Sequence, residues 1–404
     1  MKSLKIQKWV QSRNMLFHLA IKNLIGAGIR TWLNVFVTAV SFFMIIFTSG
    51  MYDGMRSHAK QVTIDTEVAG GAYWHPKYDP LDPFSYEDAH GIPPKEIHEL
   101  IQSNDAFSVL VSQASIYPNG RMMPVMMKGI EPNQSIINLP TQSLLTHTDD
   151  LIPVLIGSGM AKYTQLKVGD TFAIRWLDAN RTYDADEGVI VAIMETENFK
   201  VDMGTIWIPL DRAQTMLDME KEATYITFSK KSATIQNKEN WIYRDVNYLM
   251  RDMEAMIKAD EPGAQIMYMI LLALAGMGIF NSQILSIFRR RKEIGTLMAL
   301  GMTRSRVVTL FTLEGGMNAF FALIMTLILG GPVFIYFALY GIPLPIDYSE
   351  MGLIVAKRLI PVYTMGLFVS TTLFIAFVVL VLSYLPSRRI AKMKPTDALR
   401  GKIN

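Results

Sequence analysis

The sequence of 404 residues contains no cysteine. This absence excludes disulfide bonds, thiol catalysis, thiolate metal ligands and a lipid-anchored amino-terminal cysteine. It is compatible with a domain outside the cytoplasm, because about 200 residues can bury a stable core without cross-links. The sequence also has no match to G-x-x-x-x-G-K-[ST], so the chain is not expected to bind ATP through a P-loop.

Histidine is scarce as well, and the six histidines form no H-E-x-x-H motif or other metal-ligand spacing. The acidic residues Asp184, Asp186 and Glu187 could bind a cation, although a solvated hairpin tip is the favoured interpretation. We therefore expect no enzyme activity, no metal site and no cofactor in this chain.

Hydrophobic residues make up 50% of the chain and gather into long runs. A helix of about 20 apolar residues crosses the roughly 30 Å hydrocarbon core of a bilayer. Residues 32–51 carry no charge and form too long a run for a cleaved signal peptide. Because further runs follow at 266–288, 307–329 and 361–385, the sequence predicts an α-helical membrane protein with four transmembrane helices. Residues 333–340 are interpreted as a kinked extension of the third span or a re-entrant piece.

Charge orients the spans, because basic loops remain in the cytoplasm. Residues 1–30, 289–306 and 386–404 together hold 18 basic and two acidic side chains, whereas residues 53–265 hold 19 basic and 31 acidic ones, a formal charge of −12. The sequence thus predicts a multi-pass protein of the cell inner membrane, with both termini cytosolic and a large periplasmic domain. Membrane topology and contacts with membrane lipids explain the basic residues, so nucleic-acid binding is not expected.

The acidic segment between the first and second spans has the pattern of an α+β domain with two subdomains. Strand-forming residues at 107–117 and 121–130 flank Pro118-Asn119-Gly120, which predicts a hairpin. The other elements predicted in this segment are strands at 171–176, 189–194 and 205–208, helices at 158–165 and 210–217, and an amphipathic helix at 245–257 that bends near Pro262 into the second span.

The chain therefore divides into a series of predicted segments. They are a cytosolic or interfacial amphipathic helix at 1–31, a first span at 32–52, the extracytoplasmic domain at 53–265, a second span at 266–288, a cytosolic coupling helix at 289–306, a third span with its extension at 307–340, a short external loop at 341–360, a fourth span at 361–385 and a cytosolic tail at 386–404. An ordinary extension of the first span remains an alternative for the first segment.

The cytosolic insert at 289–306 combines basic residues with an apolar stripe that includes Ile294 and Leu297. A helix with this pattern can lie flat at a membrane surface and dock a partner. Because the chain has no P-loop of its own, such a helix is suited to receiving force from another protein.

Two features inside the predicted spans suggest specific contacts. Glu314 is costly within a span unless it is paired, and we expect it to meet Arg304, Arg306 or a helix terminus. The Glu314 carboxylate could have a structural role as part of a pair, or it could relay motion; the sequence supports both interpretations equally. Gly50 and Gly54 have a small-xxx-small spacing that would permit close approach of another helix.

The insert and the span after it resemble the coupling region of MacB/FtsX-type ABC transporter permeases. The resemblance is carried by a basic cluster, Glu-Ile-Gly, Ala-Leu-Gly, an arginine and then Glu-Gly, and it extends to residues 30–31, 49–55, 386–389 and 394–400. Within this family, residues 127–132, 156–157 and 166–170 are most similar to the lipoprotein-releasing permeases LolC and LolE.

The resemblance implies the fold of a type VII ABC permease, which works with a second permease subunit, identical or related, and two copies of a cytosolic ATPase that binds ATP and Mg²⁺. It implies that the ATPase contact is made by Glu293, Ile294, Gly295, Ala299, Leu300, Gly301 and Arg304. Position and hydrophobicity suggest that acyl chains are held by Phe43, Phe47, Met51, Met267 and Ile270, with plain helix packing as the alternative.

LolC-type members carry a longer, proline-bearing hairpin that captures a periplasmic chaperone, whereas residues 177–188 are short and contain no proline. Direct chaperone capture through this loop is therefore not expected. The functional hypothesis is a permease that transmits force from ATP hydrolysis to extract lipoproteins from the outer leaflet of the inner membrane. The alternatives are mechanical activation of a cell-wall hydrolase, as in FtsX, or export of a peptide or drug, as in MacB.

Overall fold

The computed structural model describes residues 28–148, 150–229, 240–343 and 358–390. These residues form two compact units, one of long helices and one built around a β-sheet. The sheet-containing unit, called the β-domain below, comprises residues 55–257 and 343–359. Most of the amphipathic helix predicted at 1–31, of the external loop predicted at 341–360 and of the tail predicted at 386–404 lies outside the described residues.

The described residues contain four helices long and apolar enough to cross a membrane, the number predicted from the sequence. These candidate spans are Trp32–Val68, Pro262–Arg289, Arg304–Tyr340 and Met365–Arg388. They are formed by α3 (Ile29–Thr63) with the π-helix η1 (Ile64–Val68), by α9 (Arg251–Arg289), by α11 (Arg304–Met325) with the π-helix η5 (Thr326–Gly330) and α12 (Gly331–Tyr340), and by α13 (Met365–Ile390).

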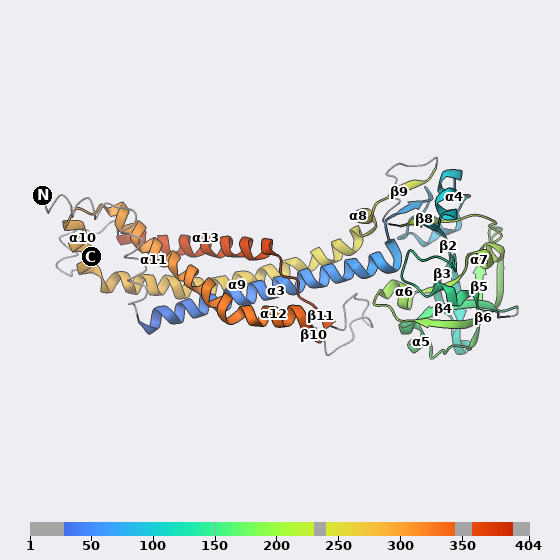
Figure 1. Ribbon diagram of the computed structural model, residues 1–404, viewed down its shortest axis with the longest axis horizontal. Helices are drawn as coiled ribbons and strands as arrows, with labels where there is room; N and C mark the ends of the chain where they lie inside the picture. Colours follow the sequence, from blue (N-terminus) through green and yellow to red (C-terminus); the bar gives the residue numbers. More distant parts are fainter. Residues whose placement is uncertain (1–27, 149, 230–239, 344–357, 391–404) are drawn as a thin grey trace. The chain divides into compact units, whose positions relative to one another are not determined.

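The structure defines the bounds of three of the long helices. The first helix, α3, continues past residue 52 into η1, and the helix predicted to lead through Pro262 into the second span is the single helix α9 (Figure 1). A proline removes one backbone donor from a helix, and α9 continues on both sides of Pro262. Residues 333–340 continue the third helix after a π-helical turn, so they form an extension and not a re-entrant piece.

Gly50 and Gly54 do mark a close approach, but the partner is not a helix. A side chain on Gly54 would collide with the carbonyl oxygen of Ile360, and one on Gly50 would collide with the ring of Tyr363. The amide of Val362 donates a hydrogen bond to the Gly50 carbonyl over 2.9 Å. The small residues therefore admit the non-helical segment that precedes α13.

Strand pairings in the β-domain close into a ring. The strand order is β3-β7-β4-β6-β5-β2-β8-β1-β9, and an additional β3–β2 pairing joins the first six strands end to end. The strands are β1 (Ala72–Trp74), β2 (Ala106–Tyr117), β3 (Met123–Ile130), β4 (Ile152–Gly157), β5 (Thr171–Leu177), β6 (Tyr183–Met194), β7 (Thr205–Pro209), β8 (Tyr225–Phe228) and β9 (Ile242–Arg244).

The long strand β2 belongs both to the ring and to the branch formed by β8, β1 and β9. Its first residues pair with β8 and its last residues pair with β5, whereas its other edge pairs with β3. The β2–β3 register runs from Val109 opposite Ile130 to Ile116 opposite Met123 and confirms the predicted hairpin.

Short helices connect and cover these strands. They are η2 (Pro83–Glu87), α4 (Lys95–Gln102), η3 (Pro118–Gly120), η4 (Thr141–Leu145), α5 (Ser158–Thr164), α6 (Phe199–Met203), α7 (Leu210–Leu217) and α8 (Val246–Leu249). Helices α5 and α7 agree with the predictions at 158–165 and 210–217. Two short strands, β10 (Ile342–Pro343) and β11 (Arg358–Leu359), form a separate two-stranded sheet.

The acidic residues expected at a hairpin tip lie instead within a strand. Asp184 is paired with Trp176 and Asp186 with Ile174 in the β5–β6 ladder, and the connection itself is residues 178–182. The strand is longer than predicted because its outer residues are polar on both faces and carry no alternating pattern. The carboxylate of Asp186 pairs with Arg212 over 3.1 Å.

Candidate coupling site

The predicted coupling segment contains one helix, α10 (Arg291–Ala299), held between α9 and α11. Its carboxyl end is closed by Gly301, whose φ of 98° favours glycine. The Gly301 amide donates to the Met298 carbonyl over 3.1 Å, and the Met302 amide donates to the Leu297 carbonyl over 3.0 Å. These two bonds form a Schellman motif, which ends α10 and turns the chain toward α11.

An apolar cluster fixes α10 against the helices on either side of it. Ile294 is only 3% exposed and packs in a cluster that includes Ile287 of α9 and Phe311 of α11. Met302, just after the helix, is buried in the same cluster. Movement of α10 is therefore expected to move the ends of α9 and α11, because close-packed apolar side chains resist separation.

The seven residues predicted to contact an ATPase fall into two groups. Ile294 and Gly295 are buried, so their place in α10 is toward the protein interior. The exposed members, which are available to a partner, are Glu293, Ala299, Leu300, Gly301 and Arg304. The sequence pattern found the segment but did not separate its inward side from its outward side.

Arg290 joins this segment to the buried carboxylate of Glu314. One guanidinium nitrogen lies 3.0 Å from Glu314 Oε2, and another lies 2.8 Å from Glu293 Oε2. The Glu314 side chain is 6% exposed, whereas that of Glu293 is 64% exposed. The guanidinium also lies 5.4 Å from the centre of the Phe311 ring, within the range of a cation–π contact.

Arg290 is a partner of Glu314 that the sequence-based expectation of Arg304, Arg306 or a helix terminus did not include. Arg290 is 24 residues away in sequence and becomes a neighbour because the chain reverses through α10. The basic cluster at 289–292 was visible in the sequence, but periodicity alone could not select which of its members turns inward. A buried acid near a basic cluster was the signal that could have identified the pair.

Further buried polar groups lie near Gly315, the residue after Glu314, where α9, α11 and α13 meet. A side chain on Gly315 would collide with the Ser383 hydroxyl and would lie 2.9 Å from Nε2 of Gln283. Gln283, Asn318 and Ser383 are all buried. Polar contacts between helices are a means of specifying helix pairing in lipid, where burial of apolar side chains provides little preference.

The residues suggested for acyl-chain contact do not form one exposed surface. Phe43 stacks on Phe47 and Phe334 with ring centres 5.5 and 5.0 Å apart, and the Phe47 ring lies 5.7 Å from that of Phe337. These contacts place both α3 phenylalanines against the third helix. The other suggested residues differ in exposure, since Met51 and Met267 are partly buried and Ile270 is 56% exposed.

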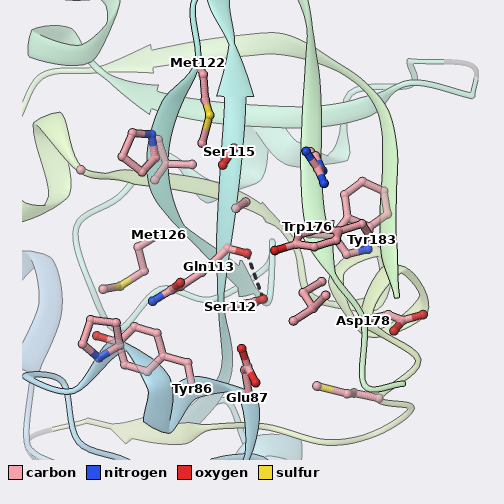
Figure 2. Close-up of a pocket in the computed structure, with 18 residues that line it drawn as sticks. Tyr86, Glu87, Ser112, Gln113, Ser115, Met122, Met126, Trp176, Asp178 and Tyr183 are labelled. Atoms are coloured by element: carbon pink, nitrogen blue, oxygen red, sulfur yellow. Dashed lines mark hydrogen bonds between the residues drawn. The ribbon is translucent and has the colours of Figure 1, made fainter. Parts of the chain in front are cut away.

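A separate pocket of about 580 Å³ lies in the β-domain. Figure 2 shows Gln113 in its middle, Tyr86 and Met126 toward one side, and Trp176 and Tyr183 toward the other. The guanidinium of Arg175, another lining residue, lies 4.1 Å from the centre of the Tyr183 ring. The lining therefore combines flexible apolar side chains with hydrogen-bonding groups.

Comparisons with known proteins match the region that contains α10. Residues 266–395 match the family described as FtsX-like permease C-terminal. Over 330 residues the chain is 22% identical to the lipoprotein-releasing system transmembrane protein LolC of Neisseria meningitidis serogroup B, an alignment that covers 72% of this chain and 76% of that relative.

Two further relatives match shorter parts. An uncharacterized ABC transporter permease of Methanocaldococcus jannaschii is 24% identical over 272 residues, which is 63% of each chain. The macrolide export ATP-binding/permease protein MacB of Neisseria meningitidis serogroup A is 29% identical over 131 residues, or 32% of this chain and 18% of MacB. The chain thus spans less than two thirds of the length of these two relatives.

Proposed function

We propose that this chain is an ABC transporter permease of the LolC/MacB/FtsX type and that it transmits force from a separate ATPase to the β-domain. The match of residues 266–395 to the FtsX-like permease family and the alignments with LolC and MacB support this proposal. The observation that carries the proposal is the construction of α10. Ile294 and Arg290 fix the helix to its neighbours, while Glu293 and Leu300 remain exposed to a partner.

In this proposal two copies of a cytosolic ATPase bind ATP and Mg²⁺, and each permease subunit presents its α10 to one of them. The permease itself is not an enzyme, and it pairs with a second permease, identical or related. The chain lies in the cell inner membrane with both termini cytosolic and residues 53–265 in the periplasm, an orientation supported by the charge bias of the loops.

The proposed substrate is a lipoprotein extracted from the outer leaflet of the inner membrane. This choice is supported by the relative named as part of a lipoprotein-releasing system, whose alignment includes most of both chains. Export of a peptide or drug is the second candidate. It is supported by the MacB alignment, which is shorter than the LolC alignment but has a higher sequence identity.

Reconstitution of the chain with its ATPase and a partner permease in proteoliposomes tests this function. ATP-dependent release of a triacylated lipoprotein is the expected result. Absence of release, together with loss of macrolide or peptide resistance in a deletion strain, would instead favour the MacB-like function. Activation of a purified cell-wall hydrolase by the same complex would favour the FtsX-like function.

Substitution on the exposed side of α10 tests the coupling segment. Leu300→Glu is expected to leave membrane insertion intact but to abolish ATP-dependent release, because it places a charge in the proposed apolar contact. Thr296→Ala, on an exposed residue of the same helix, is the matched control. Full ATP-dependent release by Leu300→Glu would show that α10 is not the docking helix. Gly301 is a poorer test position, because substitution there strains the Schellman turn.

A further inference from the structure

The end of the first long helix is embedded in the β-domain. After Thr63, the π-helix η1 places Ile64, Thr66 and Val68 in the interior. The backbone carbonyl of Asp65 accepts a hydrogen bond from the amide of Asn138 over 2.6 Å. The helix therefore does not end in a free linker but in a segment held by other parts of the domain.

A buried ion pair strengthens this attachment. Glu67 Oε1 in η1 lies 3.5 Å from Lys128 Nζ in β3, and the Lys128 side chain is only 5% exposed. The ammonium group lies 5.1 Å from the centre of the Trp207 ring and 5.8 Å from that of Tyr225. Burial raises the pKa of Tyr225 well above its ordinary value, so its hydroxyl stays neutral and Glu67 supplies the negative charge beside Lys128.

Asn198 adds a second attachment from a different element. Its side-chain nitrogen lies 3.1 Å from Thr66 Oγ1 and 3.5 Å from Glu67 Oε2, and the residue is buried. The adjacent residue, Glu197, pairs with His58 on α3. Glu197 and Asn198, which precede α6, therefore contact both α3 and the π-helix η1 that follows it.

Strand β3 connects this attachment to the pocket. Lys128 and Met126 are two residues apart, so their side chains project from the same face of the strand. Met126 lines the pocket (Figure 2), and Pro124, two residues earlier, is another lining residue. A displacement of Lys128 along or across the strand is therefore expected to displace the pocket wall.

We propose that Glu67, Lys128 and Asn198 form a joint through which motion of the first helix is delivered to the pocket wall. The proposal rests on the force-transmitting function proposed above, and it assigns these side chains a positioning role. An apolar contact would allow the helix end to slide along β3. The charges of Glu67 and Lys128 instead hold the helix end in one register against this strand. The pocket then changes shape when the helix moves.

The absence of cysteine from the sequence allows a direct measurement in the full chain. Cysteines introduced as Ser57→Cys on α3 and Thr215→Cys on α7 carry spin labels at exposed positions, and α7 packs on β3. The distance distribution between these labels reports how firmly the helix end is held. In the otherwise unchanged chain we expect a single narrow distribution.

The test variant combines Glu67→Gln with Lys128→Met, which removes both charges and avoids an unpaired buried ion. We expect its resting distribution to broaden by roughly twofold, because the remaining contacts fix the register less tightly. Lys77→Met is the matched control, since it removes a lysine from an exposed ion pair with Asp88 at 3.8 Å. An unchanged distribution in a folded double variant would overturn the joint.

A second measurement separates a transmitting role from a purely structural one. A fluorophore attached through Met122→Cys reports the pocket, and labels at Val40→Cys and Phe377→Cys report movement within the helical unit. In the complex with its ATPase, addition of ATP is expected to change both signals. The double variant should retain the helix signal and ATP hydrolysis but lose the pocket signal.

The two proposals fail in different ways. If ATP leaves the Val40–Phe377 distance unchanged, force transmission by the first helix is wrong, and the resting distribution still decides whether the joint exists. If ATP changes both signals equally in the native chain and in the double variant, force transmission stands and the joint is wrong.

Discussion

The two units of this molecule differ in the side chains that they expose. The helical unit exposes large apolar residues such as Leu373 and Phe377, whereas it buries Glu314, Asn318 and Ser383. The β-domain buries apolar side chains in its cores and carries most of the acidic residues of the chain. The larger number of exposed apolar side chains in the helical unit is expected of a helical unit in lipid and a domain in water.

The two units also differ in the interactions that determine how their helices and strands pack. In water, removal of apolar surface drives packing, so the cores of the β-domain provide most of its stability. In lipid, exposed and buried apolar residues have similar surroundings, so a polar contact such as that of Arg290 with Glu314 on α11 can help to select one packing. Each unit nevertheless contains a buried ion pair, and removing either pair tests this comparison.

The largest effect is expected from Arg290→Met, which leaves Glu314 buried without the charge of Arg290. Removing one partner of a buried pair costs about 3–5 kcal/mol, and the low exposure of Glu314 places this variant toward the upper end. Chemical unfolding in detergent micelles measures the loss. The double variant Arg290→Met with Glu314→Leu should recover most of it, and failure to recover would indicate that the pair is not the cause.

Lys128→Met makes the equivalent change in the β-domain, with a smaller expected effect. The Glu67 side chain is 28% exposed and can gain hydration when its partner is removed. We therefore expect a loss toward the lower end of the range of about 3–5 kcal/mol, measured by the same unfolding experiment. A larger loss than in Arg290→Met would reverse the ranking of the two units.

Glycine substitutions distinguish tight helix contact from open helix surface. Gly315→Ala should destabilise the helical unit by about 1–3 kcal/mol, because the added methyl group meets Ser383 and Gln283. Gly263→Ala, at an exposed position of α9 with no neighbour for the added carbon, should stabilise it by about 0.5–1 kcal/mol. Unfolding shifts of the same sign in both variants would contradict this assignment.

The smallest effect is expected from Lys77→Met. Its pair with Asp88 is exposed on both sides, and such pairs contribute about 0–1 kcal/mol because water and salt screen them. An unfolding free energy within that range of the native value is the expected outcome. A loss equal to that of Lys128→Met would mean that burial does not determine the strength of these pairs.

Local sequence signals predicted the features that depend on local chemistry. Apolar runs identified the candidate spans, and Pro118-Asn119-Gly120 identified the hairpin between β2 and β3. Ring closure was not predicted, because it depends on β3 pairing with β7, about 80 residues later in the chain. Contacts this distant leave no periodic signal in a single sequence.

The candidate coupling site was predicted as a segment but not as a set of contacts. The basic and apolar pattern located α10, and Glu314 was recognised as a residue that needs a partner. Selection of Arg290 depends on the turn at Gly301 and on the cluster around Ile294, which bring α9 and α11 together. These are tertiary contacts, and they override the local preference of each charged residue for solvent.

Helix α3 contains 35 residues without interruption, which corresponds to a rod about 50 Å long at a rise of about 1.5 Å per residue. If the proposed force transmission acts through this helix, a rigid tilt of about 10° about one end would shift the other by about 9 Å. Small angular changes at one end thus become displacements comparable with the diameter of a helix. A long helix with a fixed tip can therefore amplify a movement as well as transmit it.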